Sequence, residues 1–138
     1  MELTRRRAIQ IGVGALLISG LPFRASASTE DAIAAFTGGA EVGSGDVKLI
    51  APEIAENGNT VPIEVSSDTA KEIMVLATGN PTPSVATFKF GKLAASRAAS
   101  TRIRLAGTQD VLAIAKLEDG SFVQASRTVK VTIGGCGG

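Results

Sequence analysis

The chain has 138 residues, enough for one hydrophobic core, and this length predicts a single domain. Aromatic residues make up 4% of it and His, Trp and Tyr are absent, which excludes a His general base, a His-based metal site and an aromatic nucleic-acid platform. The formal net charge of the whole chain is only +1 at pH 7.

The first 27 residues are typical of an export signal. Arg5 and Arg6 begin a basic stretch, and the apolar segment that follows, residues 8–21, is too short to span a membrane comfortably. Thr4 precedes the arginine pair and apolar residues follow it, as in twin-arginine signals. We therefore predict export by the twin-arginine pathway in preference to general secretion, which implies a bacterial cell and a periplasmic protein.

A cleavage site is expected at the end of this leader. Ala25 and Ala27 supply the small residues that a signal peptidase accepts, which places the mature start near Ser28. An N-terminal membrane anchor is the alternative, and the cleavage pattern argues against it, so we expect no membrane attachment of the mature form. Cleavage removes four arginines and one glutamate, leaving 10 basic residues, 12 acidic residues and a net charge of −2. Nucleic-acid binding depends on a net basic surface, so this balance argues against it.

The mature domain, residues 28–133, is predicted to begin with a short helix. Ser28 or Thr29 can cap residues 30–36, and the glycine pair that starts at Gly38 ends the helical pattern. One or two helical turns are expected.

The rest of this domain has the alternation of apolar and polar residues that predicts half-buried strands, clearest at Val61, Ile63 and Val65. Asp119-Gly120 suits the tight turn of a hairpin. Seven or eight short strands predict an all-β fold, and an immunoglobulin-like antiparallel β-sandwich is the topology we expect. The predicted strands are residues 47–51, 61–65, 72–77, 85–90, 101–105, 111–117, 121–126 and 128–133.

The last five residues, Gly134-Gly135-Cys136-Gly137-Gly138, form the most informative segment. Because Cys136 is the only cysteine, it is a free thiol, a link to another chain, or a group used in chemistry. The four glycines have backbone entropy to lose on ordering and no side chains to bury, so we expect a flexible, exposed tail. At roughly 3.5 Å per extended residue, Cys136 reaches about 10 Å beyond Ile133, far enough to enter a narrow cleft in another protein.

The chemistry of this thiol favours a carrier over a catalyst. An exposed cysteine has a pKa near 8.5, so only about a few per cent is thiolate at pH 7. The chain has no His to act as a base, and activation must come from outside. We expect no catalytic residue, metal or cofactor. Two alternatives remain. The first is a non-catalytic sandwich that is disulfide-linked to a partner through Cys136. The second is a small thiol enzyme or redox protein, but such a protein is expected to have a second cysteine or an activating His, and this chain has neither.

The Gly134–Gly138 tail resembles the carrier tail of the SoxY family of thiosulfate-oxidising bacteria, and the leader, the mature size and segment 52–62 are also similar to that family. The resemblance implies an immunoglobulin-like sandwich in a heterodimer with the related subunit SoxZ. It also implies that Cys136 holds thiosulfate-derived sulfur species. Transient contacts with SoxXA, SoxB and SoxCD-type enzymes would attach, hydrolyse and oxidise that sulfur.

Overall fold

The computed structural model describes residues 28–133. The predicted leader residues Arg5, Arg6, Ala25 and Ala27 and the tail with Cys136 lie outside the described residues. Within residues 28–133 no helix is long and apolar enough to cross a membrane.

The predicted N-terminal helix is confirmed as α2 (Thr29–Thr37). Ser28 is its N-cap and forms a capping box with Asp31: the Ser28 hydroxyl accepts from the Asp31 N–H, and the Asp31 carboxylate accepts from the Ser28 N–H. Gly38 ends the helix in the left-handed conformation at φ 67°. Both ends of the helix therefore follow from local sequence.

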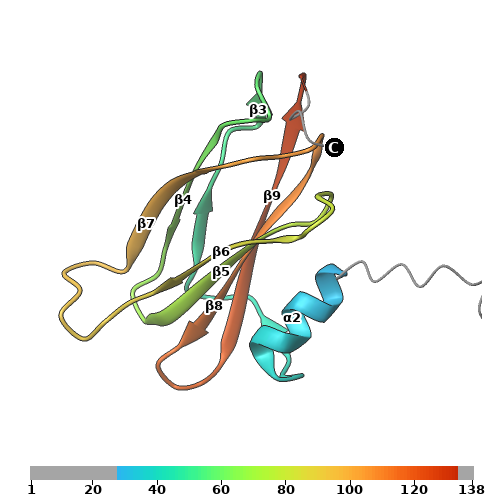
Figure 1. Cartoon of the computed structure of the whole chain (residues 1–138). Coiled ribbons are helices and arrows are strands. Elements are labelled where there is room, and N and C mark those ends of the chain that lie inside the picture. The colour runs from blue at the N-terminus through green and yellow to red at the C-terminus, as the bar shows by residue number, and fades with distance from the viewer. Residues whose placement is uncertain (1–27, 134–138) are drawn as a thin grey trace, which may run out of the picture.

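Two sheets curl around a shared core (Figure 1). The strand order is β1-β9-β8-β5-β6 in the large sheet, with β3 also paired to β9, and β2-β4-β7 in the small sheet. Within residues 28–133 the large sheet consists of β1 (Val42–Gly43), β3 (Ile54–Ala55), β5 (Ala70–Ala77), β6 (Ser84–Lys89), β8 (Gln109–Leu117) and β9 (Phe122–Val131). The small sheet consists of β2 (Lys48–Ile50), β4 (Val61–Ser66) and β7 (Ala98–Ile103).

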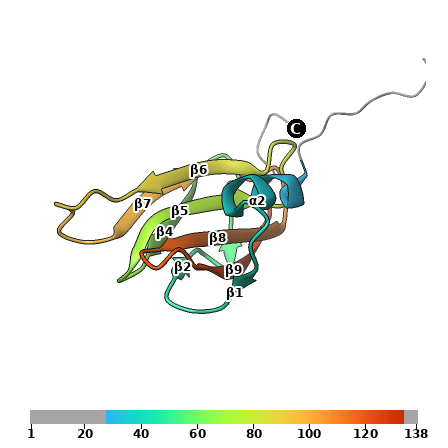
Figure 2. The same ribbon diagram turned by 90° about the horizontal axis from the view of Figure 1, so that it is seen from below.

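The main core lies between the sheets, and a second apolar cluster lies beneath α2. The inward residues of β4 are buried as the alternation predicts, with Val61 at 0% and Val65 at 1% exposure. Figure 2 shows α2 over the outer side of β5 and β8, where Phe36 packs edge-on against Phe122 with ring centroids 5.7 Å apart. Both faces of β5 are therefore covered, which explains why its sequence is an almost continuous apolar run.

The structure differs from the predicted strands in two places. The segments 121–126 and 128–133 are one strand, β9, because Arg127 continues the ladder with β8 opposite Val111. The two-residue strands β1 and β3 were not predicted; each pairs in parallel with one end of β9. The predicted hairpin turn is confirmed, with Gly120 at φ 87° between β8 and β9.

Candidate functional site

The C-terminal end of β9 is the point from which the predicted carrier tail continues. The carbonyl of Ile133 accepts from the Gly58 N–H at 2.9 Å, and the Thr132 N–H donates to the Ala55 carbonyl at 3.1 Å. The Thr132 hydroxyl donates to the Glu56 carbonyl at 3.2 Å. The chain is thus held by hydrogen bonds to segment 53–58 up to its last described residue, and Cys136 lies three positions farther along.

Gly58 also connects this end of β9 to the loop between β7 and β8. Its carbonyl accepts from the N–H of Leu105 at 2.7 Å, and the Leu105 side chain is fully buried. Thr108, in the same loop, accepts from the Val131 N–H at 3.0 Å and donates to the Val131 carbonyl at 3.4 Å. The loop therefore braces β9 two residues before Ile133.

A buried glutamine fixes this loop against the loop between β5 and β6. Gln109 is 8% exposed; its amide oxygen accepts from the Gly79 N–H at 2.8 Å, and its amide nitrogen donates to Asn80 Oδ1 at 2.9 Å and to the Gly107 carbonyl at 3.0 Å. Asn80 in turn accepts from the Ala106 N–H at 2.9 Å. A Cβ on Gly79 would lie 2.9 Å from the Gln109 Cβ, so only glycine fits there without a shift. The loops at the end of the sandwich where β9 stops are therefore tied to one another by hydrogen bonds.

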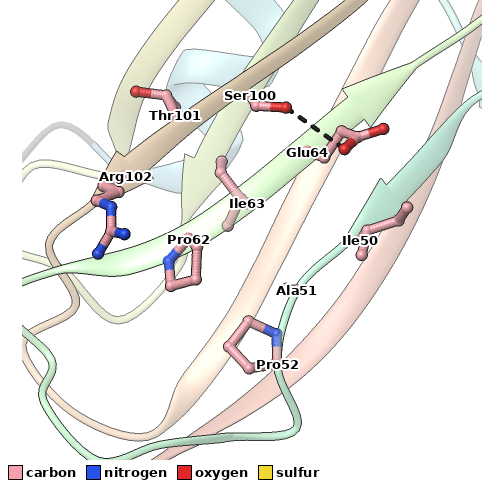
Figure 3. Close-up of a pocket in the computed structure, with 9 residues that line it drawn as sticks. All are labelled: Ile50, Ala51, Pro52, Pro62, Ile63, Glu64, Ser100, Thr101 and Arg102. Carbon is pink, nitrogen blue, oxygen red and sulfur yellow. Dashed lines mark hydrogen bonds between the residues drawn. The ribbon is translucent and has the colours of Figure 1, made fainter.

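A groove of about 580 Å³ lies on the outer face of the small sheet (Figure 3). It opens beside Pro62 because the pairing of β2 with β4 stops at Ile50 opposite Glu64, so Pro62 needs no N–H donor on that side. On its other side Pro62 pairs with Arg102 of β7. The groove is lined by Ile50, Ala51, Pro52, Pro62, Ile63, Glu64, Ser100, Thr101 and Arg102.

The polar groups of this groove are divided between its two ends. The Arg102 Nη1 donates to the Thr60 hydroxyl at 3.3 Å, and the Ser100 hydroxyl donates to the Glu64 carboxylate at 3.4 Å. Figure 3 shows the guanidinium beside Pro62 and the carboxylate turned toward Ser100. The guanidinium is at the end nearer to Gly58, because β4 runs from Val61 away from that residue.

The ion pairs of the described residues lie elsewhere, at the opposite end of the sandwich. They are Lys89–Glu72 at 3.8 Å and Arg97–Glu118 at 2.5 Å. Arg102 belongs to neither pair. Within residues 28–133 no group of three or more His, Cys, Asp or Glu side chains is arranged to hold a metal ion.

Asp46 organises the turn that precedes β5. One of its oxygens accepts from the Ser67 hydroxyl, from the N–H groups of Asp68 and Thr69, and from the Thr69 hydroxyl, at 2.9–3.1 Å. Burial alone raises the pKa of Asp46, but these hydrogen bonds to the charged form outweigh it and hold the pKa below the ordinary 3.8. Asp46 therefore stabilises the fold and is not part of the groove.

The site predicted from sequence and the groove found in the structure consist of different residues. Cys136 and the flanking glycines Gly134, Gly135, Gly137 and Gly138 lie outside the described residues. The groove with Arg102 was not anticipated from sequence. The one available signal was Pro62 within a predicted strand, because proline in a strand indicates an open edge.

Comparison with known proteins gives one family and a set of related folds. The family model described as sulfur oxidation protein SoxY matches residues 33–136. The solved sulfur carrier protein SoxY from Chlorobium limicola f thiosulfatophilum is 33% identical, with 79% of this chain and 100% of that chain covered and a TM-score of 0.66. A search of curated proteins finds no match.

The superoxide reductase (neelaredoxin) from Ignicoccus hospitalis is similar in fold alone. It is 17% identical, with 64% of this chain and 81% of that chain covered and a TM-score of 0.56. The sandwich predicted from sequence is thus confirmed both by its strands and by its structural relatives.

Proposed function

Because the chain belongs to the SoxY family of sulfur oxidation proteins, we propose that it is a periplasmic carrier that holds sulfur intermediates covalently on Cys136 during thiosulfate oxidation. A carrier role in sulfur oxidation follows from the family itself. The observation that carries the finer proposal is the extent of the family match, which continues past the sandwich to residue 136 and so includes the only cysteine.

The anchored end of β9 supports this role. Partner enzymes that act in turn on one bound sulfur group need a cargo that reaches into their active sites from a fixed base. The hydrogen bonds of Thr132 and Ile133 to segment 53–58 supply that base, and Cys136 lies within about 10 Å of it. Gly135 and Gly137, on either side of the cysteine, have no side chains, so the chain that bears the cargo is narrow.

The proposed chemistry at Cys136 begins with an oxidation by a partner. Its thiol and thiosulfate join through a new S–S bond, which releases one proton and two electrons to the haem enzyme SoxXA. Water then cleaves the bond between the sulfane sulfur and the terminal sulfonate on SoxB, so that sulfate leaves and a persulfide stays on Cys136. SoxCD-type enzymes oxidise the remaining sulfane, and this chain contributes the sulfur atom that holds the cargo throughout.

We further propose a heterodimer with SoxZ. In the described part of the chain, β6 lies at one edge of the large sheet and β7 at one edge of the small sheet, and unpaired strand edges favour association. The exposed apolar side chains of Ile50 and Ile54 add surface that a partner subunit can bury. Co-expression should therefore yield a heterodimer, whereas a stable, fully active lone chain would contradict this part of the proposal.

The carrier proposal is tested by Cys136→Ser. A hydroxyl cannot form the S–S bond that holds the cargo, so the variant should fold and bind its partner normally but lose thiosulfate-dependent oxidation. The wild-type protein treated with thiosulfate and its oxidising partner should gain mass on the C-terminal peptide, and a reducing thiol should remove that mass. Full activity of the serine variant would refute the proposal. A permanent Cys136 disulfide to the partner chain, with no cargo, would favour the structural alternative.

A further inference from the structure

We propose that the end of the sandwich opposite the tail is a docking surface for an acidic surface of a partner protein. This docking surface, the basic end, consists of Lys71, Lys89, Lys92 and Arg97 around a hollow of about 370 Å³, together with the neighbouring Leu93. The inference goes beyond the proposed function, because it requires no chemistry at the cysteine of the tail.

The hollow opens where the chain crosses from the large sheet to the small one. The Phe90 N–H donates to the Lys71 carbonyl at 2.9 Å, and residues 90–97 then lead from β6 to β7. Ala70, which is fully buried, and Phe90, which is half-buried, supply the apolar part of the lining. β5 pairs with β8 through Ala70 and then Glu72, which leaves Lys71 as the extra residue of a bulge. Bulges redirect side chains out of the regular alternation of a strand, which accounts for a lysine at this hollow.

Charge is unevenly divided between the basic end and the rest of the domain. The lining of the hollow includes four of the ten basic side chains of residues 28–138 but only two of the twelve acidic ones, Glu72 and Glu118. Each of these two carboxylates is paired with one cation of the basic end. Lys71 and Lys92 are exposed and belong to neither of the ion pairs found among residues 28–133. The hollow thus carries an excess of two positive charges on a domain whose net charge is −2.

Arg97 gives the basic end a fixed centre. Its Nη1 donates to the Asp68 carbonyl at 3.2 Å, and its Nη2 donates to the Glu118 carboxylate at 2.5 Å. Both partners are themselves held: the Asp68 N–H donates to Asp46 at 2.9 Å, and the Glu118 N–H donates to the Thr69 carbonyl at 2.9 Å. The guanidinium is therefore positioned before any partner arrives, whereas lysines at the rim have flexible stems that can adjust to a partner.

Leu93 adds an apolar contact beside these charges. Its side chain is 99% exposed, and Figures 1 and 2 both show the loop between β6 and β7 projecting past the sheets. The Ala94 N–H donates to the Gly91 carbonyl at 3.1 Å, which closes a turn with Lys92 and Leu93 at its tip. A single exposed leucine is common on protein surfaces, but this one adjoins a lysine that lies outside both ion pairs. A partner that pairs with Lys92 therefore also covers Leu93.

The pattern of charge favours a protein over a membrane or a nucleic acid. An excess of two positive charges is small beside the clusters of about four to eight lysines and arginines that bind anionic lipids. Nucleic-acid affinity likewise depends on many phosphate contacts. The carboxylates of Glu72 and Glu118 repel a uniformly anionic surface, but they suit a protein surface that carries a few basic residues among its acidic ones.

The basic end lies beyond the reach of the tail. Glu118 precedes β9 and Ile133 follows it, and the ten residues of this strand span about 33 Å. Residues 134–136 extend only about 10 Å past Ile133. A protein docked at the basic end therefore leaves the tail open to a second protein. Under the proposed function, the carrier would stay bound to one partner while another acted on its cargo.

The test titrates the full mature chain, in a reducing buffer, with a short fluorescent peptide in which acidic residues flank a Leu-Phe pair. Backbone NMR shifts of Lys71, Gly91 and Lys92 should change and saturate. The double variant Lys71→Glu, Lys92→Glu should bind the peptide about ten-fold more weakly, because two exposed attractions become repulsions, and its affinity should depend less on salt. Leu93→Ser should weaken binding about three-fold with an unchanged salt dependence.

The double variant Arg104→Glu, Lys130→Glu is the matched control. Both side chains are exposed, and the substitutions change the net charge by the same amount. Both residues are at the tail end of the sandwich, where the Arg104 carbonyl accepts from the Asn80 amide and Lys130 pairs with Ile54 of β3. This control should bind the peptide with the affinity of the wild type, and thermal unfolding checks that every variant is folded.

Four outcomes would overturn the inference. They are an absence of saturable peptide binding, an equal loss of affinity in the two double variants, binding of sodium sulfate alone with the same saturable shifts, and sedimentation with phosphatidylglycerol vesicles that is lost in Lys71→Glu, Lys92→Glu. The second would mean that net charge alone attracts the peptide. The third and fourth would assign the basic end to small oxoanions or to a membrane. None of them bears on the cysteine, so the carrier proposal would stand.

Discussion

Replacing Gln109 with methionine should destabilise the end of the sandwich from which the tail leaves. Methionine fills a similar volume but offers no amide, so the Gly79 N–H and the Gly107 carbonyl lose their partner, whereas Asn80 Oδ1 keeps its bond from the Ala106 N–H. Three hydrogen bonds at about 1 kcal/mol each, with part-buried groups left unpaired, give a loss of about 2–3 kcal/mol in the free energy of unfolding.

The measurements are thermal unfolding and urea unfolding of the mature chain, each followed by far-UV circular dichroism. For a domain of this size the melting temperature should fall by about 8–15 °C, and the urea midpoint should fall with an unchanged m value. Gln124→Met is the control, because Gln124 is exposed on β9 and should change stability by less than about 0.5 kcal/mol. A loss at Gln109 no larger than at Gln124 would refute the bracing role of this amide.

Three further predictions concern the leader, the tail and the turn before β5. Changing Arg5 and Arg6 together to lysine should leave unprocessed protein in the cytoplasm by immunoblot of cell fractions, and continued export would argue for the general secretion route. Replacing Gly135 and Gly137 with valine should leave the melting temperature unchanged but reduce turnover with partner enzymes, and normal turnover would mean that the glycines have no access role. Asp46→Asn should lower the free energy of unfolding at pH 7. Because the folded-state pKa of Asp46 is depressed, the extra stability of the wild type should be lost as the pH falls below about 4. A stability difference that did not change with pH in unfolding scans would contradict this.

The sequence was most informative where a local pattern has one structural solution. The alternation at Val61, Ile63 and Val65 and the Ser28 cap specify their elements without help from the rest of the chain. The strands β1 and β3 escaped prediction because two residues carry no period, and they exist only because β9 offers each of them a free edge.

Of the candidate site, only the proposed carrier cysteine was predictable from sequence. Cys136 stands out from composition alone, since it is the only cysteine in a chain without histidine. The groove depends on where β2 leaves β4, which is a matter of strand register between segments far apart in sequence. Arg102 therefore looked like any charged residue on a strand face until its neighbours across the sheet were known.

The position of β9 has a mechanical consequence. β8 flanks it on one side from Phe122 to Val129, and on the other side β1 meets its first residues and β3 its last ones. A tug on the chain beyond Ile133 acts along the axis of β9, across ladder bonds that run perpendicular to the strand. Such a load is shared by many hydrogen bonds at once and does not open them one after another. Under the proposed function, an enzyme that drew the tail inward would therefore strain the tail before it strained the sandwich.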